Sequence, residues 1–212
     1  MKINKLLYKL GLSIFLLFNS SFLYSSQISN ISIEGFKIGD SLIDFIDEDE
    51  ILKQSKRSKI DYQYLREPGR FLHIYLFKKF PTYDYVSFFV ERGKSGGNYF
   101  QIENEYKILG IRGEISFLNN FKGCLNKKEE VIKEVTNRFP GTRQEESINM
   151  KHPLDSSGRS FVEYTDIIFD SGDVIQLSCN DWEEGFRLKK NYSEGFTFTM
   201  QTKEVISWIE NY

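Results

Sequence analysis

The stretch FVEYTDIIFDSGDVIQLSC, residues 161–179, decides the fold class of this chain. Two apolar-rich runs flank the turn-forming tetrapeptide DSGD at residues 170–173, and this arrangement predicts a β-hairpin. In the second run Ile175, Leu177 and Cys179 alternate with polar residues, so we expect these three side chains to face the core. The sheet that contains this hairpin is therefore expected to be antiparallel.

Similar apolar runs occur along most of the chain on both sides of this hairpin. They predict further strands at Ile31–Phe36, Ile60–Leu65, Phe71–Phe80, Tyr85–Glu91, Ile108–Leu118, Phe186–Lys190 and Phe196–Met200. Strict alternation along residues 108–118 predicts one shared side for Leu109, Ile111, Ile115 and Phe117.

Helical spacing of apolar residues appears in three places. One helix is predicted to begin at Ser41, and a second at Asn126, where Glu129 completes a capping box. A short third helix is expected over Thr202–Glu210. These elements predict an α+β fold, a mostly antiparallel sheet with two or three helices packed on it, and a single domain over residues 27–212.

The first 26 residues have the composition of a secretory signal peptide. Lys2, Lys5 and Lys9 precede an apolar run and a small polar cluster, and no acidic residue occurs before Glu34. We expect residues 1–26 to be removed, leaving a periplasmic or secreted protein with no stable membrane insertion after cleavage. The uncharged stretch at residues 10–28 leaves open an N-terminal anchor in the inner membrane.

Charge excludes one class of partner. The chain has 28 basic and 30 acidic residues, a formal net charge of -2, and loss of the first three lysines gives -2 - 3 = -5. Nucleic-acid binding needs an excess of Lys and Arg, so no nucleic-acid partner is expected. The chain is 16% aromatic and contains no Ala, a bias that AT-rich codons favour, so the aromatic content says little about function.

The two cysteines, Cys124 and Cys179, predict one disulfide, because an even number in an exported protein favours pairing. The alternative is two buried free thiols. Their spacing excludes a redox pair, which has two intervening residues.

No catalytic or metal-binding signature is present, so neither a cofactor nor a metal is expected. The two histidines, His73 and His152, have no metal-ligand spacing, and no serine lies in a Gly-x-Ser-x-Gly elbow. His73 lies in an apolar run and is expected to be a hydrogen-bonded sheet residue. The segment Gly93-Lys94-Ser95 lacks the upstream glycine of a P-loop and is interpreted as a loop.

The polar segment Thr142–Ser160 is the best candidate for a binding surface. It lacks periodicity, which predicts a long loop, and it contains Arg143, His152, Asp155 and Arg159. The arginines suit a carboxylate or a sulfated sugar, and His152 would make binding pH-sensitive. The alternative is a mobile loop without a role. A stripe of aromatic residues could bind sugar, although core packing is the stronger expectation: Tyr62, Tyr64, Tyr75 and Phe77.

Three segments carry a resemblance. The run IEGFKIGDSL at residues 33–42, Cys124 before a helix, and Cys179-Asn180-Asp181-Trp182 look like uncharacterised small exported proteins of AT-rich marine bacteria. This resemblance covers nearly the whole mature chain and implies no activity. The pattern G-x-x-I-G-D-S-L-x-D at residues 35–44 is similar to the first helix entry of BamE-like envelope lipoproteins and beta-lactamase-inhibitor modules.

The leading hypothesis is a non-enzymatic exported binding or interaction module whose partner is an envelope protein or a polar ligand. The alternative is an exported hydrolase that uses polar residues of the 142–160 loop. The hydrolase predicts a concave pocket where His152, Asp155 or Arg159 converge, whereas the binding module predicts an exposed apolar patch.

Overall fold

The computed structural model describes residues 27–61, 65, 70–77, 80–92 and 106–211. The predicted signal peptide, the Gly93-Lys94-Ser95 loop, and Tyr62 and Tyr64 lie outside these residues. Within the described part of the chain, no helix is both long and apolar enough to cross a membrane.

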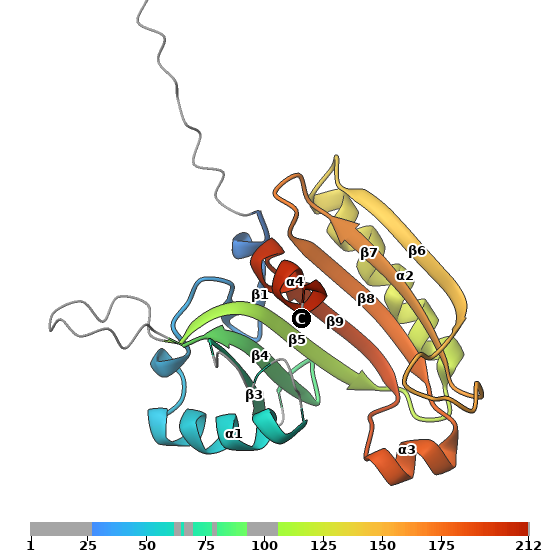
Figure 1. The fold of residues 1–212 in the computed structure, drawn as a ribbon. Helices are drawn as coiled ribbons and strands as arrows, with labels where there is room; N and C mark the ends of the chain where they lie inside the picture. Colours follow the sequence, from blue (N-terminus) through green and yellow to red (C-terminus); the bar gives the residue numbers. More distant parts are fainter. Residues whose placement is uncertain (1–26, 62–64, 66–69, 78–79, 93–105, 212) are drawn as a thin grey trace, which may run out of the picture.

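The fold is α+β, with an antiparallel seven-stranded sheet at its centre (Figure 1). In spatial order the strands are β3 (Phe71–Leu76), β4 (Tyr85–Glu91), β5 (Lys107–Ser116), β9 (Gly195–Gln201), β8 (Val174–Asp181), β7 (Phe161–Ile168) and β6 (Arg143–Lys151). The predicted hairpin is confirmed, because β7 pairs with β8 from Phe161↔Asp181 to Ile168↔Val174.

One face of the sheet carries the main core. Helix α2 (Phe121–Arg138) lies across β8 and β9, and the small hairpin of β1 (Ser32–Ile33) and β2 (Phe36–Lys37) contributes further apolar side chains to the same core. Ile175, Leu177 and Cys179 are fully buried there, as their alternation predicted. The predicted strand over Ile31–Phe36 is thus a turn-containing hairpin, since Glu34 and Gly35 adopt positive φ.

A smaller core lies on the opposite face. The C-terminal helix α4 (Lys203–Glu210) packs Val205 and Trp208 against residues of β3, β4 and β5. Its Thr202 N-cap accepts a hydrogen bond from the Val205 amide at 3.5 Å. The predicted helix over Thr202–Glu210 is therefore confirmed to within one residue.

The first helix begins later than predicted. Ser41 precedes a 3-10 turn, η2 (Leu42–Asp44), and α1 (Glu48–Asp61) follows it. Helix α1 lies beside β3, where the Gln54 side-chain oxygen accepts the Tyr75 amide hydrogen at 2.7 Å. This contact satisfies a donor on the edge strand. Because α1 extends to Asp61, the predicted strand at Ile60–Leu65 is wrong at its first two residues.

One further helix boundary differs from prediction, and the predicted shared side of Leu109 and Ile111 is wrong. Helix α2 begins at Phe121 with Asn120 as its N-cap, whose side chain accepts the Gly123 amide hydrogen at 3.0 Å, rather than at Asn126. In β5, Ile108 and Ile111 face the main core while Leu109 faces the smaller one. A bulge explains this, because Val90 pairs with Ile108 and Phe89 with Gly110, which leaves Leu109 as the extra residue.

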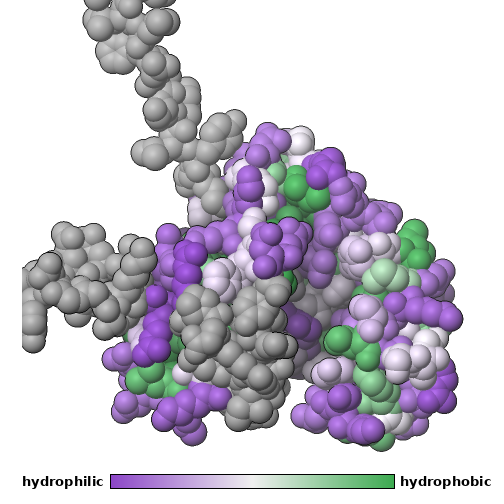
Figure 2. All heavy atoms as spheres, viewed as in Figure 1, coloured by the Kyte–Doolittle hydropathy of each residue, from purple (hydrophilic) through white to green (hydrophobic). Residues whose placement is uncertain are grey.

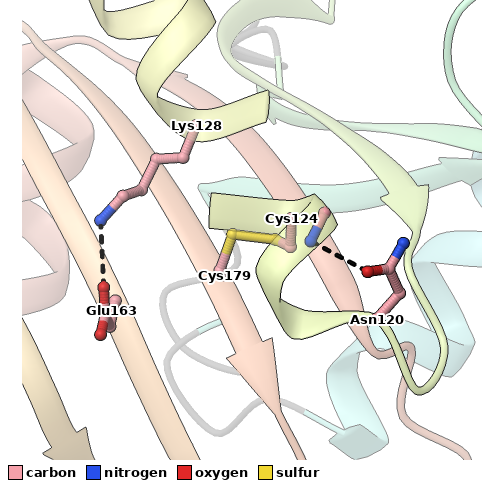
Figure 3. Close-up of a disulfide and its surroundings, with 6 residues drawn as sticks. Asn120, Cys124, Lys128, Glu163 and Cys179 are labelled. Carbon is pink, nitrogen blue, oxygen red and sulfur yellow. Dashed lines mark hydrogen bonds and ion pairs between the residues drawn. A yellow bond between two sulfur atoms is a disulfide. The ribbon is translucent and has the colours of Figure 1, made fainter. Parts of the chain in front are cut away.

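A buried disulfide joins α2 to β8 (Figure 3). The Cα atoms of Cys124 and Cys179 lie 5.9 Å apart, a separation typical of disulfides, so the predicted bridge is confirmed. Beside it, the Lys128 ammonium of α2 points to the Glu163 carboxylate of β7 at 3.7 Å, and both side chains are largely buried.

Candidate binding surface

The segment Thr142–Ser160 is not the long loop that its composition predicted. Residues 143–151 form β6, which pairs with β7 from Arg143↔Ile168 to Lys151↔Phe161. The prediction failed because β6 is the edge of the sheet and exposes side chains on both faces, so it needs no apolar alternation. A bulge between Ser147 and Met150 contains Asn149 at φ 51, a left-handed conformation that Asn tolerates.

The remaining residues, 152–160, form a tight turn organised by Asp155. Its Oδ1 accepts the Ser157 amide hydrogen at 2.9 Å, and its Oδ2 accepts the Ser160 amide at 3.0 Å and the Ser160 hydroxyl at 2.7 Å. These hydrogen bonds, Ser160 first, hold the pKa of Asp155 well below its usual range. The carboxylate is 5% exposed and fully engaged within the turn, so its role is structural.

The Ser160 hydroxyl also connects the turn to the helix beside it. Its oxygen accepts the Glu183 amide hydrogen at 3.0 Å, and Glu183 is the N-cap of α3 (Glu184–Lys190). This segment was predicted as a strand at Phe186–Lys190, which is wrong. The Glu183 carboxylate accepts the Phe186 amide at 2.7 Å, and Asn191 ends the helix in the left-handed conformation.

His152 lies between the turn and the end of β8. Its ring packs against Trp182 at a tilt of 39°, with centroids 3.9 Å apart, and its Nδ1 accepts the Leu154 amide hydrogen at 3.2 Å. A backbone amide can only donate, so Nδ1 carries no proton and the neutral ring is protonated at Nε2. Burial lowers the pKa of His152, while a hydrogen bond with Asn180 and the charge of Asp155 oppose that effect.

Trp182, which contacts His152, belongs to a cluster of aromatic side chains. Trp182 packs against Phe186 of α3 at 5.8 Å and against Tyr192 at 4.8 Å, and its Nε1 donates to the Ser193 carbonyl at 2.9 Å. This cluster lies outside the candidate site that was predicted from the sequence. Trp182, three residues after the predicted strand Val174–Cys179, was a signal that could have located it.

Exposed apolar side chains project from this supported region. Leu154 of the turn is 61% exposed and Leu188 of α3 is 64% exposed. In Figure 2 the lower-right part of the molecule, around α3, mixes green apolar residues with purple hydrophilic ones. We call the four residues His152, Leu154, Arg159 and Leu188 the turn surface; Trp182 is buried and packs against His152 from inside the fold.

The structure brings together three of the four candidate residues. His152, Asp155 and Arg159 all lie in the turn, and the Arg159 guanidinium approaches the Glu183 carboxylate at 3.6 Å from an exposed position. Arg143 lies at the far end of β6, about 26 Å away along the strand at ~3.3 Å per residue, and pairs with Glu145. Arg143 is therefore not part of the turn surface.

Open cavities occur elsewhere on the described surface. One of about 560 Å³ is lined by residues 47–50 and Lys53, and an adjoining one of about 420 Å³ is lined by residues 43–47 and Glu50. Neither cavity is lined by any of the four candidate residues, so neither gathers them around a substrate-sized space. The acidic residues at the start of α1 suit the helix dipole.

A serine–histidine pair does occur on the smaller-core face, away from the turn. The Ser87 hydroxyl lies 3.2 Å from His73 Nε2, and the Tyr75 hydroxyl lies 3.3 Å from His73 Nδ1. Burial, and secondarily the charge of Arg112, lowers the pKa of His73 to about 3. So weak a base does not activate a hydroxyl, and Ser87 is fully buried. The prediction that His73 is a hydrogen-bonded sheet residue is confirmed.

The aromatic stripe is only partly described. Tyr75 stacks on Phe77 with centroids 5.5 Å apart and ring planes 3° apart, and Phe77 also contacts Tyr85 at 5.4 Å. Phe77 is 72% exposed, so the core-packing expectation is wrong for this residue.

Within the described residues, no group of three or more His, Cys, Asp or Glu side chains is arranged to hold a metal ion. Comparison with protein-family models, curated proteins and solved structures found no match for this chain.

Proposed function

We propose that this protein is a non-enzymatic exported binding module that docks a partner protein of the cell envelope through the turn surface. The observation that carries this proposal is a division of roles within residues 152–160. The polar atoms of Asp155 and His152 are engaged in building the turn, whereas Leu154 beside them is exposed.

Contacts beneath the turn surface hold Leu154 and Leu188 in fixed positions. Leu154 follows a histidine held against Trp182, and α3, which carries Leu188, is tied to the turn through Ser160 and Glu183. Apolar anchors on a preorganised surface lose little entropy on binding. The partner that fits presents an apolar surface with an acidic group opposite Arg159, which is exposed and only loosely paired.

The same geometry argues against the hydrolase alternative. A hydrolase in this segment would need His152 or Asp155 to be available to a substrate as acid or base. Asp155 accepts three hydrogen bonds from the turn, and His152 Nδ1 accepts one. We therefore favour binding over hydrolysis.

Aspartate substitutions at the two leucines test the proposal. Burying an exposed leucine contributes about 2 kcal/mol, so Leu154→Asp and Leu188→Asp should each weaken partner binding at least ~30-fold. Binding is measured by quantitative capture from envelope extract, and then by titration with the captured partner. Phe77→Asp is the matched control, because Phe77 is equally exposed but lies near β3 at the other edge of the sheet.

A partner that binds wild type and Phe77→Asp, but neither leucine variant, supports the proposal. Circular dichroism must show that all three variants are folded. Undiminished capture by both leucine variants would mean that another surface binds the partner.

Export has its own test. The basic start and apolar run of residues 1–26 predict removal of this segment, and a disulfide is compatible with an oxidising compartment. The intact mass of protein recovered from the periplasm or medium should lack the first ~26 residues. A mass that retains residues 1–20 contradicts cleavage and favours the anchored alternative.

A further inference from the structure

A single hydrogen bond couples the ionisation of His152 to the backbone of Leu154, whose side chain is exposed. The Leu154 amide donates to His152 Nδ1 at 3.2 Å, and that nitrogen accepts only while it carries no proton. When Nδ1 takes up a proton from solvent, both ring nitrogens become donors. The Leu154 N–H then faces an N–H, so the hydrogen bond is lost and the backbone at Leu154 must move.

We propose that protonation of His152 displaces Leu154 and switches off docking at the turn surface. The docking part of this inference rests on the proposed function, whereas the displacement of Leu154 does not. The surface is competent for binding while the imidazole is neutral and loses its anchor when the imidazole is charged.

Charged groups of both signs lie on the elements around the ring. The charged residues on the elements packed around it are Lys151 of β6, Asp155 and Arg159 of the turn, Asp181 of β8 and Glu183 of the α3 N-cap. The Asp155 oxygens are held by Ser157 and Ser160, and Glu183 is shared between Arg159 and the helix N-terminus. The Asp155 charge favours the protonated ring, but its oxygens are held in the turn, so Asp155 does not replace Nδ1 as the acceptor of the Leu154 amide hydrogen.

The position of the ring sets the pH range. Packing against Trp182 partly buries the imidazole, and this burial lowers its pKa below 6.5 despite the opposing effects of Asn180 and Asp155. The neutral ring therefore persists through neutral pH, and docking should be lost as the pH falls below 6.5. The titration of His73 is separate from that of His152, because the pKa of His73 is about 3.

The test follows the Leu154 amide and the His152 ring by NMR on the purified, labelled protein between about pH 7.5 and about pH 4. In wild type the Leu154 amide resonance should move with the same midpoint as the His152 ring. In His152→Asn, the amide oxygen takes the place of Nδ1 as acceptor without titrating, so the Leu154 resonance should stay constant. In His152→Gln, no acceptor lies at that place, so Leu154 should resemble the acid form at every pH.

A Leu154 resonance that ignores the His152 titration, or that titrates equally in His152→Asn, overturns the displacement. Partner affinity should fall roughly tenfold between about pH 7.5 and the pH at which the His152 resonances show a fully protonated ring, and it should stay level in His152→Asn. If wild-type affinity stays level while Leu154→Asp abolishes binding, the switch is wrong and the proposed function stands. If both leucine variants bind normally, the proposed function fails, and the NMR result alone decides the displacement.

Discussion

Replacing both Cys124 and Cys179 with alanine will lower the free energy of unfolding by about 4 kcal/mol. The bridge closes a loop of 55 residues, and the loss of this cross-link returns that much conformational entropy to the unfolded chain in the chain-entropy model. Urea denaturation of the oxidised wild type and the double variant measures the difference. Alanine is chosen over serine because both positions are fully buried and a hydroxyl there would lack partners.

The single variant Cys124→Ala is the matched control. Either substitution breaks the bridge, so its cost should approach that of the double variant, which follows from non-additivity of interacting residues. A thiol reagent added to unfolded, non-reduced wild type should find no free cysteine. A double variant within about 1 kcal/mol of wild type would show that the bridge contributes little to stability.

The second large effect is a loss of stability in mild acid caused by His73. The pKa of its ring is lowered from 6.5 to about 3 by burial and by Arg112. A group whose pKa is depressed in the folded state makes the unfolded state bind more protons, so stability is full above pH 6.5 and falls as the pH decreases. The slope approaches about 1.4 kcal/mol per pH unit once the unfolded ring is mostly protonated, which gives a loss of roughly 2 kcal/mol between pH 6.5 and 4.5.

His73→Asn isolates this effect, because asparagine keeps polar atoms near Ser87 and Tyr75 without titrating. Its stability at neutral pH will be lower, and its slope between pH 6.5 and 4.5 should be nearly flat. Chemical denaturation at several pH values measures both slopes. His152→Asn should keep most of the wild-type slope, since that ring is less buried and its pKa is lowered less. Equal slopes in wild type and His73→Asn would contradict the burial argument.

The positions of several elements were predictable from local pattern. The tetrapeptide at residues 170–173 forms the hairpin turn, where Asp173 and Ser171 hydrogen-bond at 2.8 Å. Strand β4 matches its predicted bounds, and β9 and α4 match to within a residue. These elements each bury one face or lie in the centre of the sheet, so the core imposes its periodicity on their sequence.

The errors occur where the core does not impose such a pattern. Strand β6 exposes both faces at the sheet edge, so its sequence resembles a polar loop. Helix α3 has seven residues and no buried side chain, and its alternating Phe186 and Leu188 resemble a strand. In β5, the bulge at Leu109 shifts the alternation by one residue, an effect that depends on pairing with β4.

The even cysteine count predicted the Cys124–Cys179 bridge, which lies outside the candidate site. Within the site, local pattern located one short segment that holds most of the candidate residue types. Residues 152–160 contain the histidine, the carboxylate and the arginine that meet in the turn. The roles of these residues depend on contacts between elements, which appear only in the folded structure. Arg143 lies at the other end of β6, where it pairs with Glu145. Asp155 accepts hydrogen bonds within the turn, and His152 packs against Trp182, thirty residues further along the chain. The physical reason is that local pattern encodes burial along one element, whereas contacts between elements depend on strand order, which no local segment contains.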